Sequence, residues 1–311
     1  MQLAWKQPLL LMQLLVLAAA TEECEKESAE PAGSSLLQKQ LLVHETVGAV
    51  AVTRVTHPWD KHIFVVGTHH KAGSQLLRNI MAHFFDILGA TVSCQYDGHG
   101  DSVTSLNREN ECTLFPAPIR FHNHISKDAI LQMKKEAKDM KGDLRGVMIV
   151  RDPLEMVASS YCYHHRGAES WNPMEKGIPE MGPEEGVPEM AKRMLMEIKD
   201  MAEAYEVSAP HVLVVRYEHL THSPEHFDAS VEKIMEFLVG DEITELQKSE
   251  IRRAVRVEDL HRASDLGISA ENRFNHTNDE ADMEAARAAL PLTPADLYAE
   301  YVKYREVLGY S

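Results

Sequence analysis

The amino-acid sequence predicts an α/β fold, a single domain in which a central, mostly parallel sheet is flanked by helices. Short apolar segments typical of buried strands occur at Ile63–Val66, Gly146–Val150 and His211–Arg216. Segments with the 3.6-residue apolar period of helices alternate with them. This alternation favours a parallel sheet with helices on its faces. In such sheets, ligands bind outside the carboxyl ends of the strands, so the turns that follow these strands are the first places to look for a site.

The first strand leads into a turn with the composition of an anion site. Residues 63–74 read I-F-V-V-G-T-H-H-K-A-G-S, and a helix is predicted from Gln75 to Leu88. This P-loop-like strand–loop–helix aims backbone N–H groups and a helix N-terminus at one point, where Lys71 adds a positive charge. Lys71 precedes Gly73, so the order G-x-x-x-x-G-K-[ST] of nucleoside triphosphatases is not met. A plain turn with a solvated lysine is the alternative.

A second polar turn follows the strand Gly146–Val150. Arg151 ends this strand, Pro153 is well placed to begin a helix, and Ser159 lies eight residues after the arginine. Arg151 before the helix and Ser159 on it could contact one phosphate group from two sides. The alternative is an arginine in a salt bridge and a buried serine.

The remaining segments complete the α/β pattern. A short strand is predicted near residues 118–125, and further helices are predicted at 127–141, 189–207, 224–239, 244–255 and 294–308. Residues 166–188 are acidic and rich in proline and glycine, which predicts a long loop or lid over the site.

Composition limits the classes of function. The chain of 311 residues has a net charge of −16, which argues against a nucleic-acid-coating protein, because phosphate contacts need clustered Lys and Arg. Any anion site must therefore be local. Seventeen histidines raise the question of metal binding, but no H-E-x-x-H or Cys/His ligand spacing is present. We therefore expect no metal, and stoichiometric zinc in the purified protein would contradict this expectation.

The N-terminus has the features of a targeting segment. Residues 1–20 combine a basic start, a short apolar run and small residues, as in a signal peptide or an uncleaved signal anchor. A buried helix is the third alternative. Residues 21–58 are predicted to be an acidic stem, and the folded domain is expected at 59–311. These features predict the secretory pathway, in the Golgi lumen or as a secreted protein, with membrane contact only through residues 1–20.

Entry into the secretory pathway makes disulfides and glycosylation possible. Cys94 and Cys112 bracket a polar stretch that a disulfide could close, whereas Cys162 lies in an apolar helical pattern and is expected to be a buried thiol. Cys24 is the fourth cysteine, and spacing does not settle the pairing. Asn275 begins one glycosylation sequon.

Together, the two turns resemble those of the sulfotransferase superfamily that uses 3′-phosphoadenosine 5′-phosphosulfate (PAPS), over about residues 59–240. In that family a K-x-G-[ST] loop binds the 5′-phosphosulfate, and a strand followed by R-[DN]-P and a later serine binds the 3′-phosphate. The resemblance extends to R-Y-E-x-L, matched at 216–220. It implies PAPS binding by Lys71, Ala72, Gly73, Ser74, Gln75, Arg151 and Ser159.

The resemblance also implies how the transfer would proceed. Lys71 would stabilise charge on the bridging phosphate oxygen, and a general base would activate the acceptor hydroxyl. His124 is placed like the histidine base in the K-T-H segment of cytosolic sulfotransferases, although His122 stands where that segment has lysine. Asn79 stands where glycosaminoglycan-type enzymes have a glutamate base. The alternative is that both histidines are ordinary strand-edge residues.

The expected reaction is sulfuryl transfer from PAPS to a hydroxyl of a carbohydrate or a secreted small molecule, without a metal. An additional arginine, Arg262 or Arg273, is expected to contribute to the site. One alternative is a nucleotide kinase, which would need a Walker lysine and a magnesium carboxylate that are not in place. The other is a secreted nucleotide-binding protein of the same fold without turnover. Measuring PAPS binding and release of 3′,5′-ADP distinguishes the three.

Overall fold

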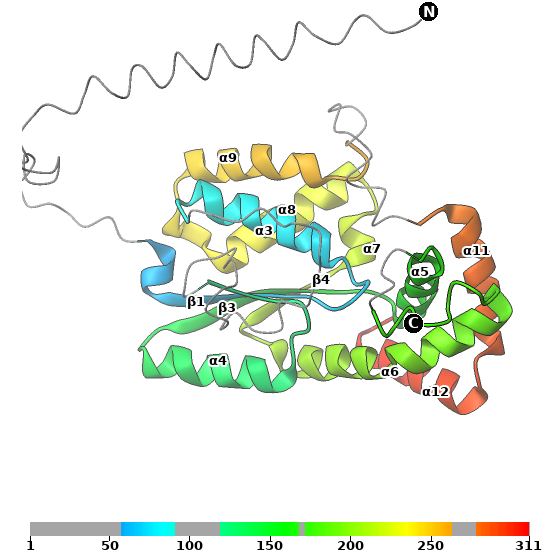
Figure 1. The fold of residues 1–311 in the computed structure, drawn as a ribbon. Coiled ribbons are helices and arrows are strands. Elements are labelled where there is room, and N and C mark those ends of the chain that lie inside the picture. Colours follow the sequence, from blue (N-terminus) through cyan, green and yellow to red (C-terminus); the bar gives the residue numbers. More distant parts are fainter. Residues whose placement is uncertain (1–56, 91–118, 168–171, 263–277, 311) are drawn as a thin grey trace, which may run out of the picture. The chain divides into compact units, whose positions relative to one another are not determined.

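A single parallel sheet organises the part of the chain that the structure describes. The computed structural model describes residues 57–90, 119–167, 172–262 and 278–310, all within one compact unit, Thr56–Ser311. In these residues, four parallel strands pair in the order β2-β1-β3-β4 (Figure 1). The strands are β1 (His62–Gly67), β2 (Ile119–His122), β3 (Asp143–Val150) and β4 (Val212–Arg216). The predicted α/β class with a parallel sheet is confirmed.

The strand order reverses direction at β1. From β1 the chain passes to β2 on one side and then returns to β3 on the other side of β1. Gly67 at the end of β1 is in register with His122 of β2 and Met148 of β3. The carboxyl ends of the three strands therefore lie at one edge, and ligands of open parallel sheets bind where the strand order reverses.

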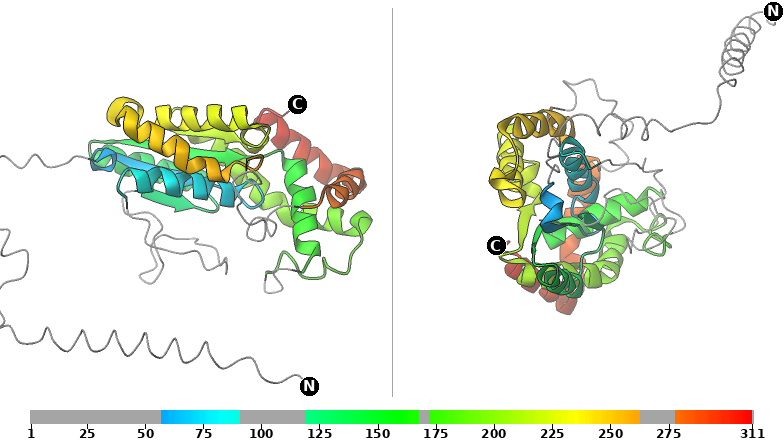
Figure 2. Two further views of the ribbon diagram at one scale, coloured as in Figure 1. Left: turned by 90° about the horizontal axis from the view of Figure 1, so that it is seen from above. Right: turned by 90° about the vertical axis from the view of Figure 1, so that its left-hand side faces the viewer.

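Helices cover both faces of the sheet. The described helices of more than one turn are α3 (Ser74–Ile87), α4 (Lys127–Asp139), α5 (Pro153–His165), α6 (Pro183–Ser208), α8 (Pro224–Leu238), α9 (Glu245–Val255), α11 (Glu280–Ala289) and α12 (Ala295–Val307). Helices α3, α8 and α9 lie on one face and α4 and α6 on the other (Figures 1 and 2). Helices α5, α11 and α12 pack together beside the end of β3 that leads into α5. The one-turn helix α7 (Tyr217–Leu220) follows β4.

Helix α6 begins earlier than the sequence predicts. Its first residue is Pro183, so the segment predicted as a loop up to residue 188 is partly helical, with Pro188 inside the helix. Packing explains the difference. Gly186 lies against Tyr161 of α5, where a Cβ on the glycine would be 2.3 Å from the ring. Tyr161 also donates a hydrogen bond to the carbonyl of Met181 at 3.0 Å. These contacts with α5 outweigh the low helix propensity of glycine and proline.

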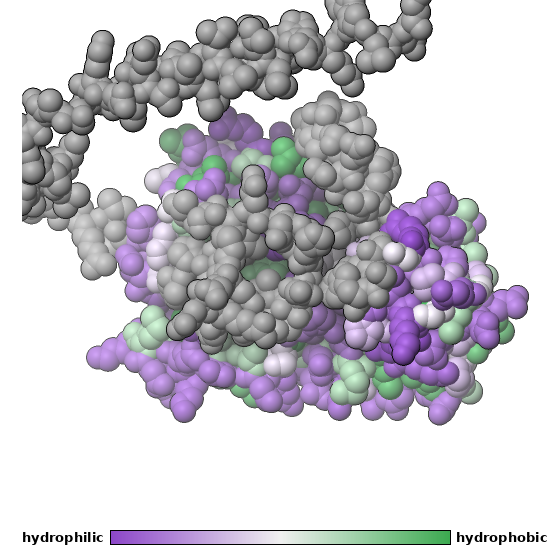
Figure 3. Space-filling model, viewed as in Figure 1, coloured by the Kyte–Doolittle hydropathy of each residue, from purple (hydrophilic) through white to green (hydrophobic). Residues whose placement is uncertain are grey.

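The described surface is mainly hydrophilic, as the predicted solvent-facing sides of the helices require. Figure 3 shows purple, hydrophilic residues over most of the visible described surface, with hydrophobic residues scattered among them. Large exposed apolar side chains are likewise distributed over several elements: Leu131, Met140, Met196, Leu246, Leu260 and Leu292. No helix within the described residues is both long and apolar enough to cross a bilayer.

The prediction for Cys162 is confirmed. Its thiol is free and buried in α5, and burial raises its pKa from the ordinary thiol value to about 11. The predicted targeting segment at 1–20 and nearly all of the stem at 21–58 lie outside the described residues, and so do Cys24, Cys94, Cys112, Arg273 and Asn275.

Candidate functional site

The loop after β1 has a backbone that favours anion binding. β1 ends at Gly67, where a Cβ would lie 2.8 Å from the side chain of Ile125. Lys71 (φ 61°) and Gly73 (φ 103°) adopt left-handed backbone conformations before α3 begins at Ser74. Gly73 has no side chain to cap the helix, so the amides of the first turn of α3 are available to a ligand.

Arg151 joins the two motifs that the sequence analysis singled out. Its Nη1 donates a 3.1 Å hydrogen bond to the carbonyl of Lys71. Its guanidinium lies 4.5 Å from the ring centre of Tyr217, at the end of β4. Within the described residues, the buried Nε of Arg151 has no hydrogen-bond partner. A buried N–H group without a partner is rare and is a position that an anionic ligand could satisfy.

Lys71 extends towards α5. Its Nζ lies 3.8 Å from the ring centre of Tyr163, and the guanidinium of Arg166 lies 5.5 Å from the same centre. Aromatic faces attract cations through their quadrupole, so Tyr163 helps to hold two positive groups near each other. The sequence did not single out Tyr163 or Arg166 for this role. Tyr163 is on α5, the helix that carries Ser159, and Arg166 directly follows that helix.

Ser159 is linked to Arg166 through Asn278. The serine is 3% exposed, and its Oγ accepts a 3.0 Å hydrogen bond from Nδ2 of Asn278. Oδ1 of Asn278 accepts a 3.1 Å bond from Arg166. A phosphate group that contacts Ser159 would therefore also meet Asn278. Nothing in the sequence indicates this role for Asn278, which lies 119 residues after the serine.

The other residues expected to bind PAPS have side chains that are buried or bonded within the protein. Ala72 is fully buried, and Oγ of Ser74 donates to the carbonyl of His69 at 2.8 Å. The side-chain amide of Gln75 bonds to Asn79 and Arg78 on the same helix. With these side chains engaged within the protein, the N–H groups of the first helical turn are the groups that could bind an anion.

Two side chains discussed in the sequence analysis are engaged elsewhere. Asn79 donates to Glu258 at 3.0 Å. Arg262 forms two hydrogen bonds, of 2.7 and 2.8 Å, with the carboxylate of Asp228 on α8. The structure therefore does not favour Arg262 as the additional donor-binding arginine.

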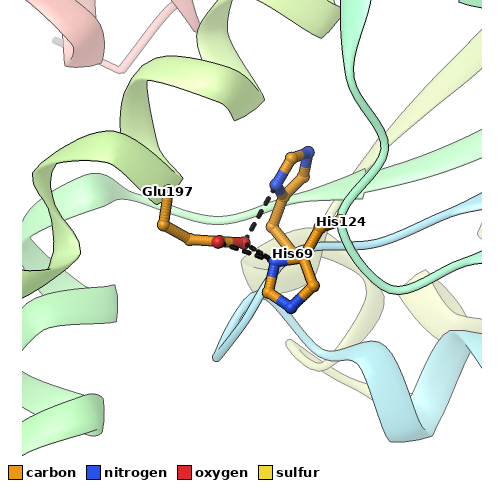
Figure 4. Close-up of side chains that lie close together, drawn as sticks. All are labelled: His69, His124 and Glu197. Carbon is orange, nitrogen blue, oxygen red and sulfur yellow. Dashed lines mark hydrogen bonds and ion pairs between the residues drawn. The ribbon is translucent and has the colours of Figure 1, made fainter. Parts of the chain in front are cut away.

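His124 forms a close pair with Glu197 of α6, a residue that sequence analysis missed. Nδ1 of His124 lies 2.8 and 2.7 Å from the two carboxylate oxygens. The same carboxylate contacts Nδ1 of His69 at 3.1 Å (Figure 4). It also accepts a 2.9 Å hydrogen bond from the backbone N–H of His70. Glu197 thus connects the loop after β1, which carries Lys71, to the turn after β2, which carries His124.

The electrostatics of this cluster follow from burial and charge pairing. Burial would raise the pKa of Glu197, but hydrogen bonds from His124 and His69 lower it well below the ordinary carboxyl range. Burial is the largest single effect on His124 and would lower its pKa, but the hydrogen bond to Glu197 and the negative charges of Glu197 and Asp200 together raise it. The pKa of His122 is lowered, by burial first and then by Arg120. His124 is therefore the better supported of the two histidines.

A buried polar chain continues from the same loop. Nε2 of His70 lies 3.1 Å from Nε2 of His164, and Nδ1 of His164 lies 3.7 Å from the buried carboxylate of Glu175. Burial, followed by the charges of Lys71 and His164, lowers the pKa of His70 well below the ordinary value. A neutral His70 beside Lys71 avoids placing two cations on consecutive residues of the loop.

Comparisons with known proteins give matches among solved structures only, at low similarity. Neither a family model nor a curated protein sequence matches the chain. Among solved structures, the chain is similar to that of mouse sulfotransferase SULT7A1 complexed with PAP, with a TM-score of 0.45 and 15% sequence identity. The match covers 81% of this chain and 86% of the mouse chain.

Proposed function

We propose that the protein is a PAPS-dependent sulfotransferase that moves a sulfuryl group to an acceptor hydroxyl. The observation that carries the proposal is the bond from Arg151 to the backbone of Lys71, which unites two anion-binding turns at the ends of neighbouring strands. PAPS carries two separate anionic groups, a 5′-phosphosulfate and a 3′-phosphate. The loop of Lys71 and the α3 N-terminus suit the first, and the region of Arg151 and Ser159 suits the second.

In the proposed reaction, His124 is the general base. Its Nδ1 is bonded to Glu197, which orients the ring and leaves Nε2 to accept the proton of the acceptor hydroxyl. The hydroxyl oxygen attacks sulfur as the bond from sulfur to the bridging phosphate oxygen breaks. Lys71 and the first-turn amides of α3 then stabilise the charge that develops on that oxygen.

The proposed acceptor is a carbohydrate or a secreted small molecule. This choice is supported by the targeting features of residues 1–20, which would place the protein in the Golgi lumen or outside the cell. The net charge of −16 disfavours highly sulfated polymers as acceptors, because like charges repel. Fractionation of expressing cells, with and without residues 1–20, tests the location independently of the reaction.

The test of the activity uses the full chain, labelled PAPS and a panel of glycans, tyrosyl peptides and small alcohols. Sulfated product and release of 3′,5′-ADP are expected. Binding of PAPS without release would favour the non-catalytic alternative. Phosphorylated product with ATP and magnesium would favour a kinase.

Substitution of the base separates turnover from donor binding. We expect His124→Ala to lower turnover by about 10²–10⁴-fold, the usual contribution of general base catalysis, with PAPS affinity near that of the unchanged protein. Lys71→Ala and Arg151→Ala should instead weaken PAPS binding. His83→Ala is the matched control, since His83 also pairs with a glutamate, Glu258, at 3.3 Å. Full turnover in His124→Ala would show that His124 is not the general base.

A further inference from the structure

Glu197 gathers two histidines into a set that could coordinate a metal ion. One ring nitrogen each of His69 and His124 and a carboxylate oxygen of Glu197 all lie within 4.8 Å of one another, and Nδ1 of both histidines contacts Oε1 of the glutamate. The three residues come from the loop after β1, the turn after β2 and helix α6 (Figure 4). Two imidazoles and one carboxylate form a common zinc ligand set, and catalytic zinc sites combine three protein ligands with one open position.

The spacing of these atoms is close to that of a zinc site. Zinc lies about 2.0–2.1 Å from imidazole nitrogen and about 2.0–2.2 Å from carboxylate oxygen, so tetrahedral ligand atoms are about 3.3 Å apart. Oε1 of Glu197 lies 2.8 Å from Nδ1 of His124 and 3.1 Å from Nδ1 of His69. Oε1 of Glu197 is therefore within about 0.5 Å of the spacing that zinc requires from each histidine. The ligand atoms of the two histidines, which lie within 4.8 Å of each other, would adjust to the same spacing.

Burial and charge also favour a cation. His69 is fully buried and the side chain of Glu197 is only 16% exposed, so a cation bound between them would be largely shielded from water, where attraction to the carboxylate is stronger. The side chain of His124 is 43% exposed, so solvent can reach a fourth coordination position. The carboxylate of Asp200, one turn further along α6, acts on His124 as a second negative charge.

We propose that His69, His124 and Glu197 bind one zinc ion, and that the bound ion switches off the sulfuryl transfer. The second half rests on the proposed function, in which Nε2 of His124 accepts a proton. When zinc occupies Nδ1, the proton of the neutral ring has to reside on Nε2. Nε2 then has no free lone pair and cannot accept the proton of the acceptor hydroxyl. The ion is an inhibitor here and not a cofactor, so the reaction itself still needs no metal.

Zinc binding is measured on the full chain without any activity assay. The protein is stripped with a chelator and titrated with Zn²⁺ in competition with a chromophoric chelator. One ion per chain is expected at this site, and His69→Ala and Glu197→Ala should each weaken its binding by at least about tenfold, as loss of a ligand does. His83→Ala, which removes a histidine from a different histidine–glutamate pair, should leave the affinity unchanged.

A second measurement, the visible absorption of bound Co²⁺, uses a variant that conserves the shape of the side chain and is therefore expected to fold. Co²⁺ in place of zinc should give the visible absorption of a tetrahedral site in the unchanged protein and lose it in Glu197→Gln, which keeps the shape of the side chain. Absence of stoichiometric zinc, or equal affinity in all variants, overturns the site. Continued turnover of the zinc-saturated protein would overturn the proposed inhibition but not the zinc site. A metal-free protein without sulfotransferase activity would count against the proposed function. In that case the zinc titration would still test the metal site by itself.

Discussion

At Gly73, backbone conformation and surrounding space both select glycine. Its φ of 103° lies in the left-handed region, and a Cβ would lie 2.7 Å from Tyr217 and 2.9 Å from Ile149. We expect Gly73→Ala to destabilise the protein by about 1–3 kcal/mol, from backbone strain and overpacking, and to weaken PAPS binding by moving the loop. Thermal unfolding and donor titration measure the two effects.

Gly89, at the other end of α3, provides a matched control. Its φ is 87°, but a Cβ there would be 3.8 Å from the nearest atom. Gly89→Ala therefore introduces the left-handed strain without the clash, and it should leave PAPS binding unchanged. Equal PAPS affinity in the two alanine variants would show that the space around Gly73 does not shape the anion loop.

Sequence reasoning at the residue scale succeeded where two residues follow neighbouring strands. Lys71 and Arg151 could be placed together because each comes shortly after a predicted buried strand, and parallel strands end at the same edge. Glu197 could not be found in this way. It is 128 residues from His69 and lies within a helix, where an inward-facing glutamate has no distinct pattern in the sequence.

At the element scale, the start of α6 depends on its contact with α5. Glycine inside a helix normally destabilises it by roughly 0.5–1 kcal/mol relative to alanine, so Gly186→Ala would ordinarily stabilise α6. Here a Cβ would lie 2.3 Å from the ring of Tyr161. We expect Gly186→Ala to destabilise the protein by about 1–3 kcal/mol instead, measured by the midpoint of urea unfolding.

The sign of this effect is checked against Gly182, which precedes the same helix. A Cβ on Gly182 has nothing within 4 Å, and its φ of −64° suits any residue. Gly182→Ala should therefore change stability by less than Gly186→Ala. If Gly186→Ala were the more stable variant, the helix start would be set by local propensity and not by Tyr161.

The same contact explains which helix boundaries could be predicted. Helices with a clear apolar period, such as α8 and α9, were predicted to within one residue at each end. The start of α6 was not predicted, because its glycine and prolines indicate a loop. The packing contact with Tyr161 that makes this segment helical cannot be seen in the sequence. Helix α11 was not predicted at all. It is short and rich in alanine, and a buried stripe of Met283, Ala286 and Ala289 gives a weak apolar signal.

At the scale of the whole molecule, the C-terminal segment ties the strand ends together. Arg305 of α12 forms hydrogen bonds of 2.8–3.0 Å with both oxygens of Asp152, directly after β3. Arg216, at the end of β4, donates to the carbonyls of Leu308 and Gly309 at 3.2 and 2.8 Å. The tail therefore contacts the residue next to Arg151. The parallel sheet could be expected from the α/β alternation, but the contact between Arg305 and Asp152 joins residues 153 apart and has no local signal.

We therefore expect the last helix to affect donor binding from outside the site. In Arg305→Gln, Asp152 loses its bidentate charged partner, while the hydrogen bond that it accepts from the N–H of Leu154 remains. The loss should destabilise the protein by about 1–3 kcal/mol, as for other hydrogen bonds to charged groups, and should weaken PAPS binding through Arg151. Urea unfolding and donor titration of the same preparation measure both.

Lys303→Gln is the control for this last variant, because it removes a charge from the same helix without touching the strand ends. Lys303 pairs with Glu300 at 3.7 Å, and the two side chains are 64% and 47% exposed, so the pair contributes at most about 0.5 kcal/mol. If Arg305→Gln lost stability but bound PAPS normally, the tail would only support the fold. Weaker binding in Arg305→Gln, with Lys303→Gln unchanged, would mean that α12 positions Arg151 through Asp152.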